Sequence, residues 1–388
     1  MTGLYVHVPF CTRRCGYCDF NTYALDRAPI TPEDWAWGIE MEVWDGTVGP
    51  FDTVFFGGGT PSLLGAPALA KVLDGIRGTV GLEDGLDGGD GVAPGAEVTV
   101  EANPETVTPE LLDGLLAAGV TRLSLGMQSS DEAVLATLDR LHTPGQALRS
   151  VELARAAGFT DISLDLIYGT PGESLASWQA TLESALSSGP DHVSCYALIV
   201  ERGTPLAKRI ERGELAEPDD DLMADEYILA DELLTAAGLG WYELSNWAKP
   251  GHQCRHNLGY WQGVNYYGVG PGAHSYHDHV FDKWLGNTYS PHRWWNHRSP
   301  ERWIGALRHN GSPAARRERI DAVKAHEERV LLELRLATGL PLDALTPTER
   351  ARVPSLVADG LATTSNDHLT LTLKGRLLAD KVTLDLLD

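Results

Sequence analysis

Six short apolar runs alternate with amphipathic stretches over the first 200 residues, and this alternation constrains the fold more than any other feature of the chain. Each run reads as a β-strand, and each is followed by a Gly, Pro or polar turn and then by a helical pattern. The runs are 4–8, 53–56, 97–101, 122–126, 162–168 and 192–198. Because neighbouring parallel strands need crossover helices, the pattern predicts an α/β fold with a parallel sheet.

Polar and Gly-rich residues come directly after several of these strands, at 57–60, 101–103, 128 and 169–172. In open parallel sheets and in barrels, ligands gather at the carboxyl ends of the strands. The local pattern does not choose between a sheet and a barrel, but in both it predicts one site at this edge.

The pattern changes after residue 200. A long helix is expected over 219–237, followed by a stretch rich in Trp, Tyr and Gly to about residue 300. Residues 318–388 read as helices with a small hairpin before a last helix, which resembles a winged helix. We therefore predict three parts, 1–215, 216–310 and 311–388. The run 81–97 lacks an apolar period and reads as a flexible acidic loop.

The chain carries 54 acidic and 31 basic residues, a formal net charge of −23. This excess disfavours nucleic acid and anionic membranes as partners, so the winged-helix pattern is read as structural and any membrane contact as peripheral. The sequence contains no run of 18 or more apolar residues, so no membrane span is expected. The N-terminus enters a strand pattern at once, without the regions of a signal peptide, which predicts a cytoplasmic protein.

Three of the five cysteines stand within eight positions, as Cys11-x3-Cys15-x2-Cys18. A structural zinc site normally has four Cys or His ligands, and only His7 lies near enough in sequence to add one. An iron–sulfur cluster prefers thiolates and can leave one iron without a protein ligand. The spacing therefore indicates a [4Fe–4S] cluster with an open iron.

This cysteine pattern, with Tyr17 inside it and its place after the first strand, resembles the radical S-adenosylmethionine (SAM) superfamily. The resemblance implies that SAM binds the open iron and that an electron from the cluster generates a 5′-deoxyadenosyl radical. It also implies a partial (β/α)6 TIM-like barrel, with a mostly helical, winged-helix-like C-terminal domain. The turn F-F-G-G-G-T-P at 55–61 resembles the element that holds the SAM amino group.

Further single residues match the HemN/HemW family of that superfamily, which contains oxygen-independent coproporphyrinogen III dehydrogenase and a haem chaperone. The resemblance assigns no catalytic residue. It implies SAM-site roles for Tyr5, Tyr17, Gly58, Gly59, Thr60, Glu101, Gln128, Arg140 and Asp165.

Two features separate the branches of the family. The dehydrogenase adds a fourth cysteine two residues after the third, where this chain has Phe20, and it carries an N-terminal extension that is absent here. The sequence H-N-L-G-Y-W at 256–261 resembles the haem-binding signature of the chaperone branch, with His256 as axial ligand and Asn257, Tyr260 and Trp261 as further haem contacts. His274 is a second candidate for a haem contact, and Arg255 could pair with a propionate.

These resemblances imply a haem chaperone that holds a [4Fe–4S] cluster, SAM and haem. Its expected partners are haem or porphyrin, a reductant for the cluster and a haem acceptor protein. A respiratory enzyme is a candidate for the acceptor, and a bacterioferritin-like protein is a candidate for a haem donor. The dehydrogenase is the alternative function, in which the protein would be an oxidoreductase. A third alternative is a non-catalytic regulatory module that senses iron–sulfur status and uses its winged helix as the contact surface.

Overall fold

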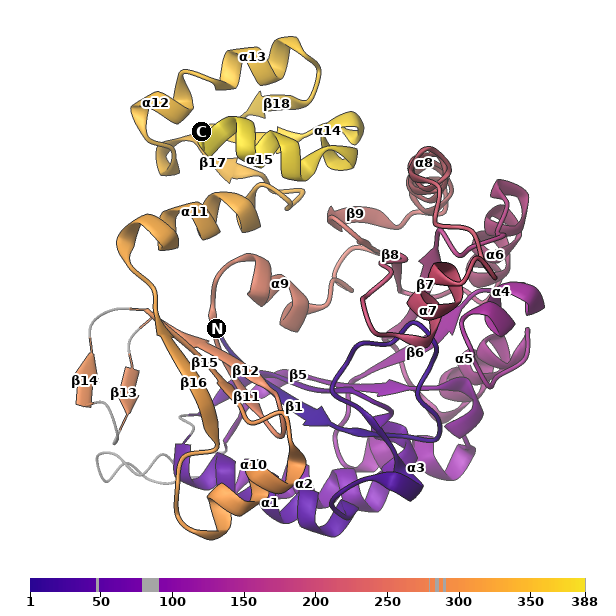
Figure 1. Ribbon diagram of the computed structural model, residues 1–388, viewed down its shortest axis with the longest axis vertical. Helices are drawn as coiled ribbons and strands as arrows, with labels where there is room; N and C mark the ends of the chain where they lie inside the picture. Colours follow the sequence, from indigo (N-terminus) through magenta and orange to yellow (C-terminus); the bar gives the residue numbers. More distant parts are fainter. Residues whose placement is uncertain (47–48, 79–90, 279, 283–285, 289–290, 388) are drawn as a thin grey trace.

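The structure is a computed structural model that describes residues 1–388 except 47–48, 79–90, 279, 283–285, 289–290 and 388. A twelve-stranded sheet organises it (Figure 1). Six parallel strands form the centre of the sheet in chain order: β1 (Thr2–Val8), β4 (Phe51–Gly58), β5 (Val92–Ala102), β6 (Arg122–Gln128), β7 (Ile162–Tyr168) and β8 (His192–Ala197). Since the predicted strands all fall within or against these elements, the predicted α/β fold is confirmed.

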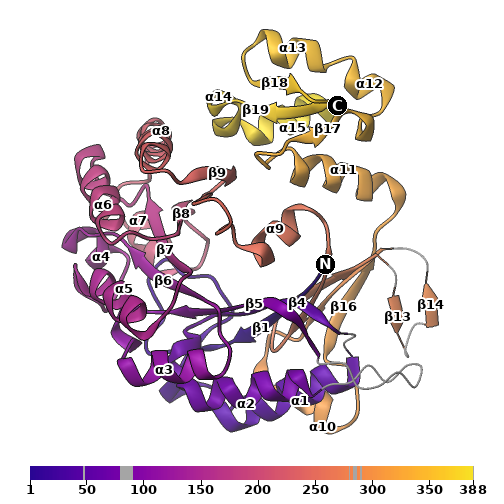
Figure 2. The ribbon, with the colours of Figure 1, turned by 180° about the vertical axis from the view of Figure 1, so that it is seen from behind.

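Helices connect these strands and cover the convex side of the curved sheet (Figures 1 and 2). They are α1 (Pro32–Gly46), α2 (Ala66–Arg77), α3 (Pro109–Ala117), α4 (Glu132–Thr137), α5 (Gln146–Ala157) and α6 (Leu175–Ser187). Pro in the first turn marks the start of α1 and α3, and the Thr108 hydroxyl accepts a hydrogen bond from the N–H of Leu111 at the N-cap of α3. The main hydrophobic core lies between this helical layer and the sheet.

Further strands extend the sheet at both edges. Beyond β8 lie the antiparallel strands β10 (Asn246–Ala248) and β9 (Gly240–Glu243). Beyond β1 lies the parallel strand β11 (Asn265–Val269), followed by the antiparallel strands β12 (His274–His277), β15 (His292–Asn296) and β16 (Ala314–Arg319). No hydrogen bonds join β16 to β9 in the described part of the chain, so the barrel is partial, as predicted.

Shorter elements complete the chain up to residue 319. The small strand pairs are β2 (Phe10–Cys11) with β3 (Tyr23–Ala24), and β13 (Val280–Asp282) with β14 (Gly286–Thr288). The remaining helices are α7 (Pro205–Glu211), α8 (Asp220–Ala236), α9 (Arg255–Trp261) and α10 (Pro300–Arg308). The long helix expected over 219–237 is therefore α8.

The C-terminal region forms a separate core around Val330, Leu340 and Leu369. Its elements are α11 (Ala322–Glu333), β17 (Leu340–Pro341), α12 (Pro347–Arg350), α13 (Val353–Ala358), β18 (Ala362–Ser365), β19 (His368–Leu371), α14 (Leu373–Leu377) and α15 (Ala379–Leu387). The predicted hairpin is β18–β19, where Asn366 and Asp367 both have positive φ, as a tight hairpin turn requires. Helices with a three-stranded sheet confirm the winged-helix-like arrangement.

One prediction needs correction. The acidic loop expected over 81–97 ends earlier, because β5 begins at Val92 and Glu97 pairs with Thr53 of β4. Residues 92–97, V-A-P-G-A-E, have no strand pattern of their own because Pro and Gly interrupt the apolar residues, and the strand depends on pairing with β4, which is distant in sequence. Residues 81–90 of that loop lie outside the described part of the chain.

The domain limits 1–215, 216–310 and 311–388 remain a prediction. Strand β16 still pairs with β15 of the large sheet, and the second core begins at Val330. Arg376 of α14 joins that region to α8 by two 2.8 Å hydrogen bonds to the Asp231 carboxylate. Among the described helices, none combines the length and the apolar character needed to cross a bilayer.

Candidate functional site

A cavity of about 510 Å³ occupies the inside of the partial barrel and reaches the carboxyl ends of its strands. All twelve residues predicted to hold the cluster and SAM line this one cavity. They are Tyr5, Cys11, Cys15, Tyr17, Cys18, Gly58, Gly59, Thr60, Glu101, Gln128, Arg140 and Asp165. The fold therefore brings together residues from five strand ends, and their roles as ligands remain a prediction.

The three cysteines are free thiols on the loop that follows β1. Cys11 is buried at the end of β2, whereas Cys15 and Cys18 are half-buried. Burial raises the pKa of the Cys11 thiol to about 11 and also raises that of Cys18. A metal cluster displaces such protons when thiolates bind it. Cys254 also lines the cavity, but it stands before α9 and donates to Glu97, so it does not belong to this loop. Three thiol donors on one loop fit an iron–sulfur cluster better than a closed zinc site.

At the end of β4, Gly58 and Gly59 lie too close to β1 and β2 to carry a side chain. Gly58 has a φ of +111°, and a Cβ there would lie 2.5 Å from the His7 ring. A Cβ on Gly59 would lie 2.4 Å from the Phe10 carbonyl oxygen. The N–H of Thr60 donates to the same carbonyl at 2.7 Å. The turn is thus fixed against the strand that carries Cys11.

Two half-buried carboxyl groups, Glu101 and Asp165, face the cavity from β5 and β7. Glu101 accepts a 3.1 Å hydrogen bond from the N–H of Gly58, and Asp165 accepts one of 2.8 Å from the Ser124 hydroxyl. Burial, together with the negative charge of Asp165, raises the pKa of Glu101 to about 8. A cationic ligand would favour the ionised form of both groups. The chemistry of this wall therefore suits the ammonium and sulfonium charges of SAM.

Arg140 and Asn103 join the strand ends to the cysteine loop. Arg140 donates through Nη2 to Asn103 Oδ1 at 2.7 Å and through Nη1 to Cys15 Sγ at 3.6 Å. Asn103 Nδ2 donates to the Thr60 hydroxyl at 3.1 Å. Arg140 Nε and Gln128 Oε1 are buried without a hydrogen-bond partner, so the cavity wall retains an unused donor and an unused acceptor. Such a wall fits a polar ligand.

Sequence reasoning placed Asn103 at this edge but missed other residues of the cavity, including Ser124, Ser163 and Ser194. In the strand register, Ser124 of β6 pairs with Ser163 of β7, and Ser194 of β8 pairs with Asp165 of β7. Because Ser163 and Asp165 are two residues apart on one strand, all three serines lie on the same face of the sheet. The signal was present, because polar residues alternate with apolar ones along these strands. In a sheet covered by helices, that alternation marks the face that lines a cavity.

Comparisons with known proteins agree with this geometry. The sequence profile of the radical SAM superfamily matches residues 5–185. A protein of Mycobacterium tuberculosis named heme chaperone HemW is 48% identical over 391 residues, covering 99% of this chain and 94% of the relative. The protein of that name from Bacillus subtilis is 33% identical, with 98% of each chain covered. The chain belongs to the HemW family of radical SAM proteins.

A solved structure, coproporphyrinogen III oxidase (HemN) from Escherichia coli, described as a radical SAM enzyme, has the same fold. It superposes with a TM-score of 0.79 at 20% identity and covers 99% of this HemW-family chain and 89% of its own. Membership of the radical SAM superfamily implies a [4Fe–4S] cluster and SAM.

Phe20 stands two residues after Cys18, at the position where the dehydrogenase branch is expected to carry its fourth cysteine. It lines the cavity and is 62% exposed.

The HemW-like segment His256–Trp261 forms α9, which Glu97 of β5 caps. Cys254 at the N-cap offers no side-chain cap, but Glu97 accepts hydrogen bonds from the N–H groups of Arg255 at 2.9 Å and His256 at 3.0 Å. Arg255 donates through Nη1 to the Gly95 carbonyl. A chain segment distant in sequence therefore sets the position of the helix.

His256 is buried, and both of its ring nitrogens lie beside hydroxyl groups. Nδ1 is 2.8 Å from Thr53 Oγ1, and Nε2 is 2.9 Å from Tyr260 Oη. The ring stacks on Phe55 at a centroid distance of 5.2 Å, and burial lowers the pKa of His256 to about 3. Axial ligation by His256 remains a prediction, and it requires the contact with Tyr260 to open.

The predicted haem residues do not all face one space. His256, Asn257 and Tyr260 line the barrel cavity, whereas Trp261 and the other face of Tyr260 line a second cavity. The helical spacing explains this division, because His256 and Tyr260 lie one turn apart on the same side and Trp261 points elsewhere. The segment is thus a wall between two cavities.

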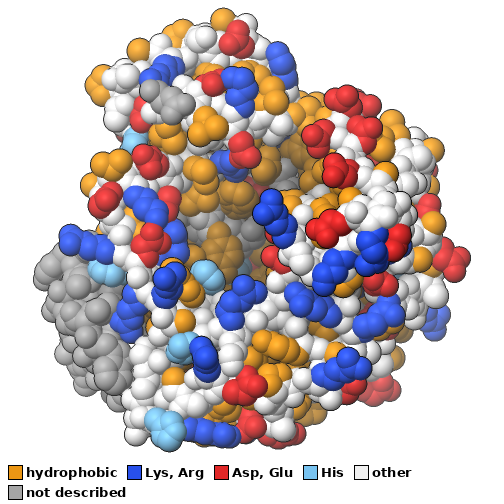
Figure 3. Space-filling model, in the orientation of Figure 1, with side chains coloured by type: hydrophobic (Ala, Val, Ile, Leu, Met, Phe, Trp, Pro, Cys, Tyr) orange, Lys and Arg blue, Asp and Glu red, His pale blue; other side chains and the backbone are white. Residues whose placement is uncertain are grey.

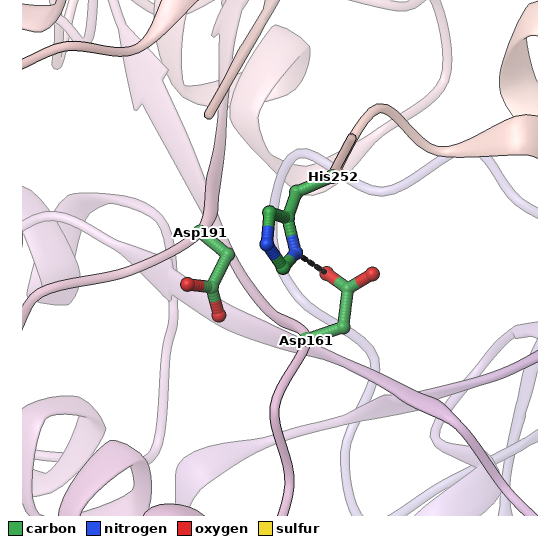
Figure 4. Close-up of side chains that lie close together, drawn as sticks. All are labelled: Asp161, Asp191 and His252. Atoms are coloured by element: carbon green, nitrogen blue, oxygen red, sulfur yellow. Dashed lines mark ion pairs between the residues drawn. The ribbon is translucent and has the colours of Figure 1, made fainter. Parts of the chain in front are cut away.

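A cluster of Asp161, Asp191 and His252 has the ligand spacing of a metal site (Figure 4). Asp161 and Asp191 precede β7 and β8, so the cluster lies at the end of the barrel opposite the cysteines. Arg122 pairs with Asp161, while Arg155 and Lys249 pair with Asp191. Three cations already neutralise the two carboxylates, and we read the cluster as an ion-pair network that joins strand starts.

Proposed function

We propose that this protein is a haem chaperone, which binds haem and delivers it to an acceptor protein. The observation that carries the proposal is the full-length likeness, at 48% identity, to a protein named heme chaperone HemW. The arrangement of the His256–Trp261 segment beside the SAM-type cavity supports it. The acceptor belongs to a class of proteins that take up haem, such as a respiratory enzyme.

The barrel cavity is proposed to hold the cluster on Cys11, Cys15 and Cys18, with SAM beside it. When bound and reduced by an external electron donor, the cluster supplies an electron to the sulfonium of SAM. Around this group the chain binds and orients. Glu101 and Asp165 offer carboxylates to the cationic ligand, and Arg140 holds the cysteine loop to the strand ends.

Tyr5, Tyr17, Gly58, Gly59, Thr60 and Gln128 complete the proposed SAM site. Tyr5 contacts His7 Nδ1 at 3.1 Å through its hydroxyl, which aligns it beside the glycine turn. The turn needs its small residues, because a Cβ on Gly58 would meet the His7 ring and a Cβ on Gly59 would meet the Phe10 carbonyl beside Cys11. Haem is proposed to contact the segment that carries His256, Asn257, Tyr260 and Trp261.

One preparation separates the chaperone from the coproporphyrinogen III dehydrogenase of the same family. Full-length protein with a reconstituted cluster should bind haemin, seen as a shifted Soret band, and should transfer it to an apo-haem protein. With SAM, a reductant and coproporphyrinogen III, it should form no protoporphyrinogen IX. A triple Cys11→Ala, Cys15→Ala, Cys18→Ala variant is the control for the cluster. Formation of protoporphyrinogen IX, or no uptake of haemin, would refute the proposal.

A further inference from the structure

The second cavity, of about 800 Å³, lies outside the proposed SAM site and has a strongly aromatic lining. Its size falls in the range of small-molecule sites, roughly 300–1,000 Å³. Tyr260, Trp261, Tyr266, His274, Tyr276 and Trp295 contribute rings to its walls. Helix α11 covers it with Ala325 and Leu332. Figure 3 shows the hollowed face between the C-terminal region and the barrel, with hydrophobic side chains deep inside and Lys and Arg side chains around it.

Strand register explains why these rings meet. Tyr266 pairs with Gly3 of β1 on one side and with Tyr276 of β12 on the other. His274 pairs in turn with Trp295 of β15. Directly paired residues project from the same face of a sheet, and Gly3 contacts His256 from inside the barrel. The second cavity therefore continues the concave face of the barrel over the antiparallel extension of the sheet.

His274 is the side chain in this cavity that can ligate a metal through an available nitrogen. Its ring is exposed and stacks on Trp295 at 5.6 Å and 15°, and within the described residues neither ring nitrogen has a hydrogen-bond partner. His256, on the other side of the wall, has both nitrogens beside hydroxyl groups. Neutral imidazole is a common axial ligand of haem iron.

Cationic groups surround His274, as a ligand with carboxylate side chains requires. Arg293 and Arg298 lie near enough to act electrostatically on its ring. Arg316 pairs with Trp295 in the strand register, is exposed and has no ion pair in the described part of the chain. The three acids of the cavity are matched by three cations, since Glu318 pairs with Lys324, Glu328 with Arg293 and Glu333 with Arg329. Arg316 is thus free to bind a propionate.

We propose that haem, on the basis of the function proposed above, sits in this second cavity with the His274 imidazole as an axial ligand to its iron. Tyr260 and Trp261 then contact the porphyrin from the wall, and His256 positions Tyr260 from the far side of that wall. The Tyr260 hydroxyl contacts His256, and the Tyr260 ring packs at right angles to that of Tyr266 with a centroid distance of 4.6 Å. This one side chain therefore borders both the SAM-type cavity and the proposed haem site.

Haemin titration of the full-length protein, followed by the Soret band, tests the ligand. His274→Ala should weaken haemin binding by about tenfold or more and change the Soret position, and added imidazole should restore it. His277→Ala is the matched control, since His277 stands on the same strand but packs on Tyr267 at the opposite face. An unchanged spectrum in His274→Ala, with coordination lost in His256→Ala, would overturn the proposal.

A second variant tests the place separately from the ligand. Ala325→Trp should fill part of the cavity from α11 and reduce the affinity for both haemin and metal-free protoporphyrin IX, while SAM binding stays unchanged. His274→Ala should weaken only haemin, because the metal-free porphyrin has no iron to ligate. Equal porphyrin binding in Ala325→Trp and in the parent chain would refute the location. If the parent chain itself takes up no haemin, the proposed function fails instead.

Discussion

Replacement of Glu97 by Ala should release α9 from the barrel. The side chain is 7% exposed and accepts hydrogen bonds from the N–H groups of Arg255 and His256, and no other cap holds that end of the helix. A hydrogen bond to a charged group contributes about 1.5–3 kcal/mol. Loss of two, with the donors left at a buried helix start, should lower the free energy of unfolding by about 3–5 kcal/mol. A helix of seven residues does not persist without such support.

Urea denaturation and haemin titration together check this prediction. Glu97→Ala should shift the urea midpoint downward and weaken haemin uptake, because α9 carries His256, Tyr260 and Trp261. Glu110→Ala is the control, since Glu110 also stands in the first turn of a helix but is exposed, and it should change stability by less than about 0.5 kcal/mol. Equal midpoints for Glu97→Ala and the parent chain would show that Glu97 does not hold α9.

Three further perturbations test other parts of the structure. Burial raises the pKa of Glu226 to about 7, so the folded chain binds its proton more tightly than the unfolded chain; this stabilisation is present below about pH 4.5 and is lost as the pH rises through about 7. Melting curves against pH should therefore slope less over that window in Glu226→Gln, and an identical slope would contradict the burial argument. Gly58→Ala should reduce SAM affinity by about tenfold in equilibrium dialysis because its Cβ meets the His7 ring, whereas Gly172→Ala, at a similar positive φ in open space, should bind SAM normally. Asp191→Asn should cost about 2–4 kcal/mol by leaving Arg155 and Lys249 without their partner, and Mg²⁺ should leave the melting temperature of the parent chain unchanged; a rise with Mg²⁺ would restore the metal interpretation of Figure 4.

The parallel sheet and much of the barrel cavity could be predicted because their signals are local. Apolar runs with turns behind them located β1, β4, β5, β6, β7 and β8, and each polar strand end had to reach the same edge once the strands were parallel. The cysteine spacing indicated a cluster on the loop after β1. Resemblance, rather than pattern, then assigned a SAM role to residues such as Arg140 and Gln128.

Other features depend on contacts between distant segments, which no local pattern contains. The start of β5 lies within the run 81–97, which has no strand pattern, and no local pattern indicates that Glu97 caps α9, 158 residues away in the chain. The inward serines of β6, β7 and β8 alternated visibly with apolar residues, but only the sheet showed which face they line.

By itself, the sequence determined the alternating fold, the three thiol donors and the kinship of the chain, since these depend on residue type and spacing along the backbone. Tertiary structure alone decided that His256 and Trp261 face different cavities. It also decided that His274, Trp295 and Tyr276 converge on the second one. The physical reason is that strand pairing across β11, β12 and β15 sets which side chains share a face, and that pairing depends on the packing of the whole sheet.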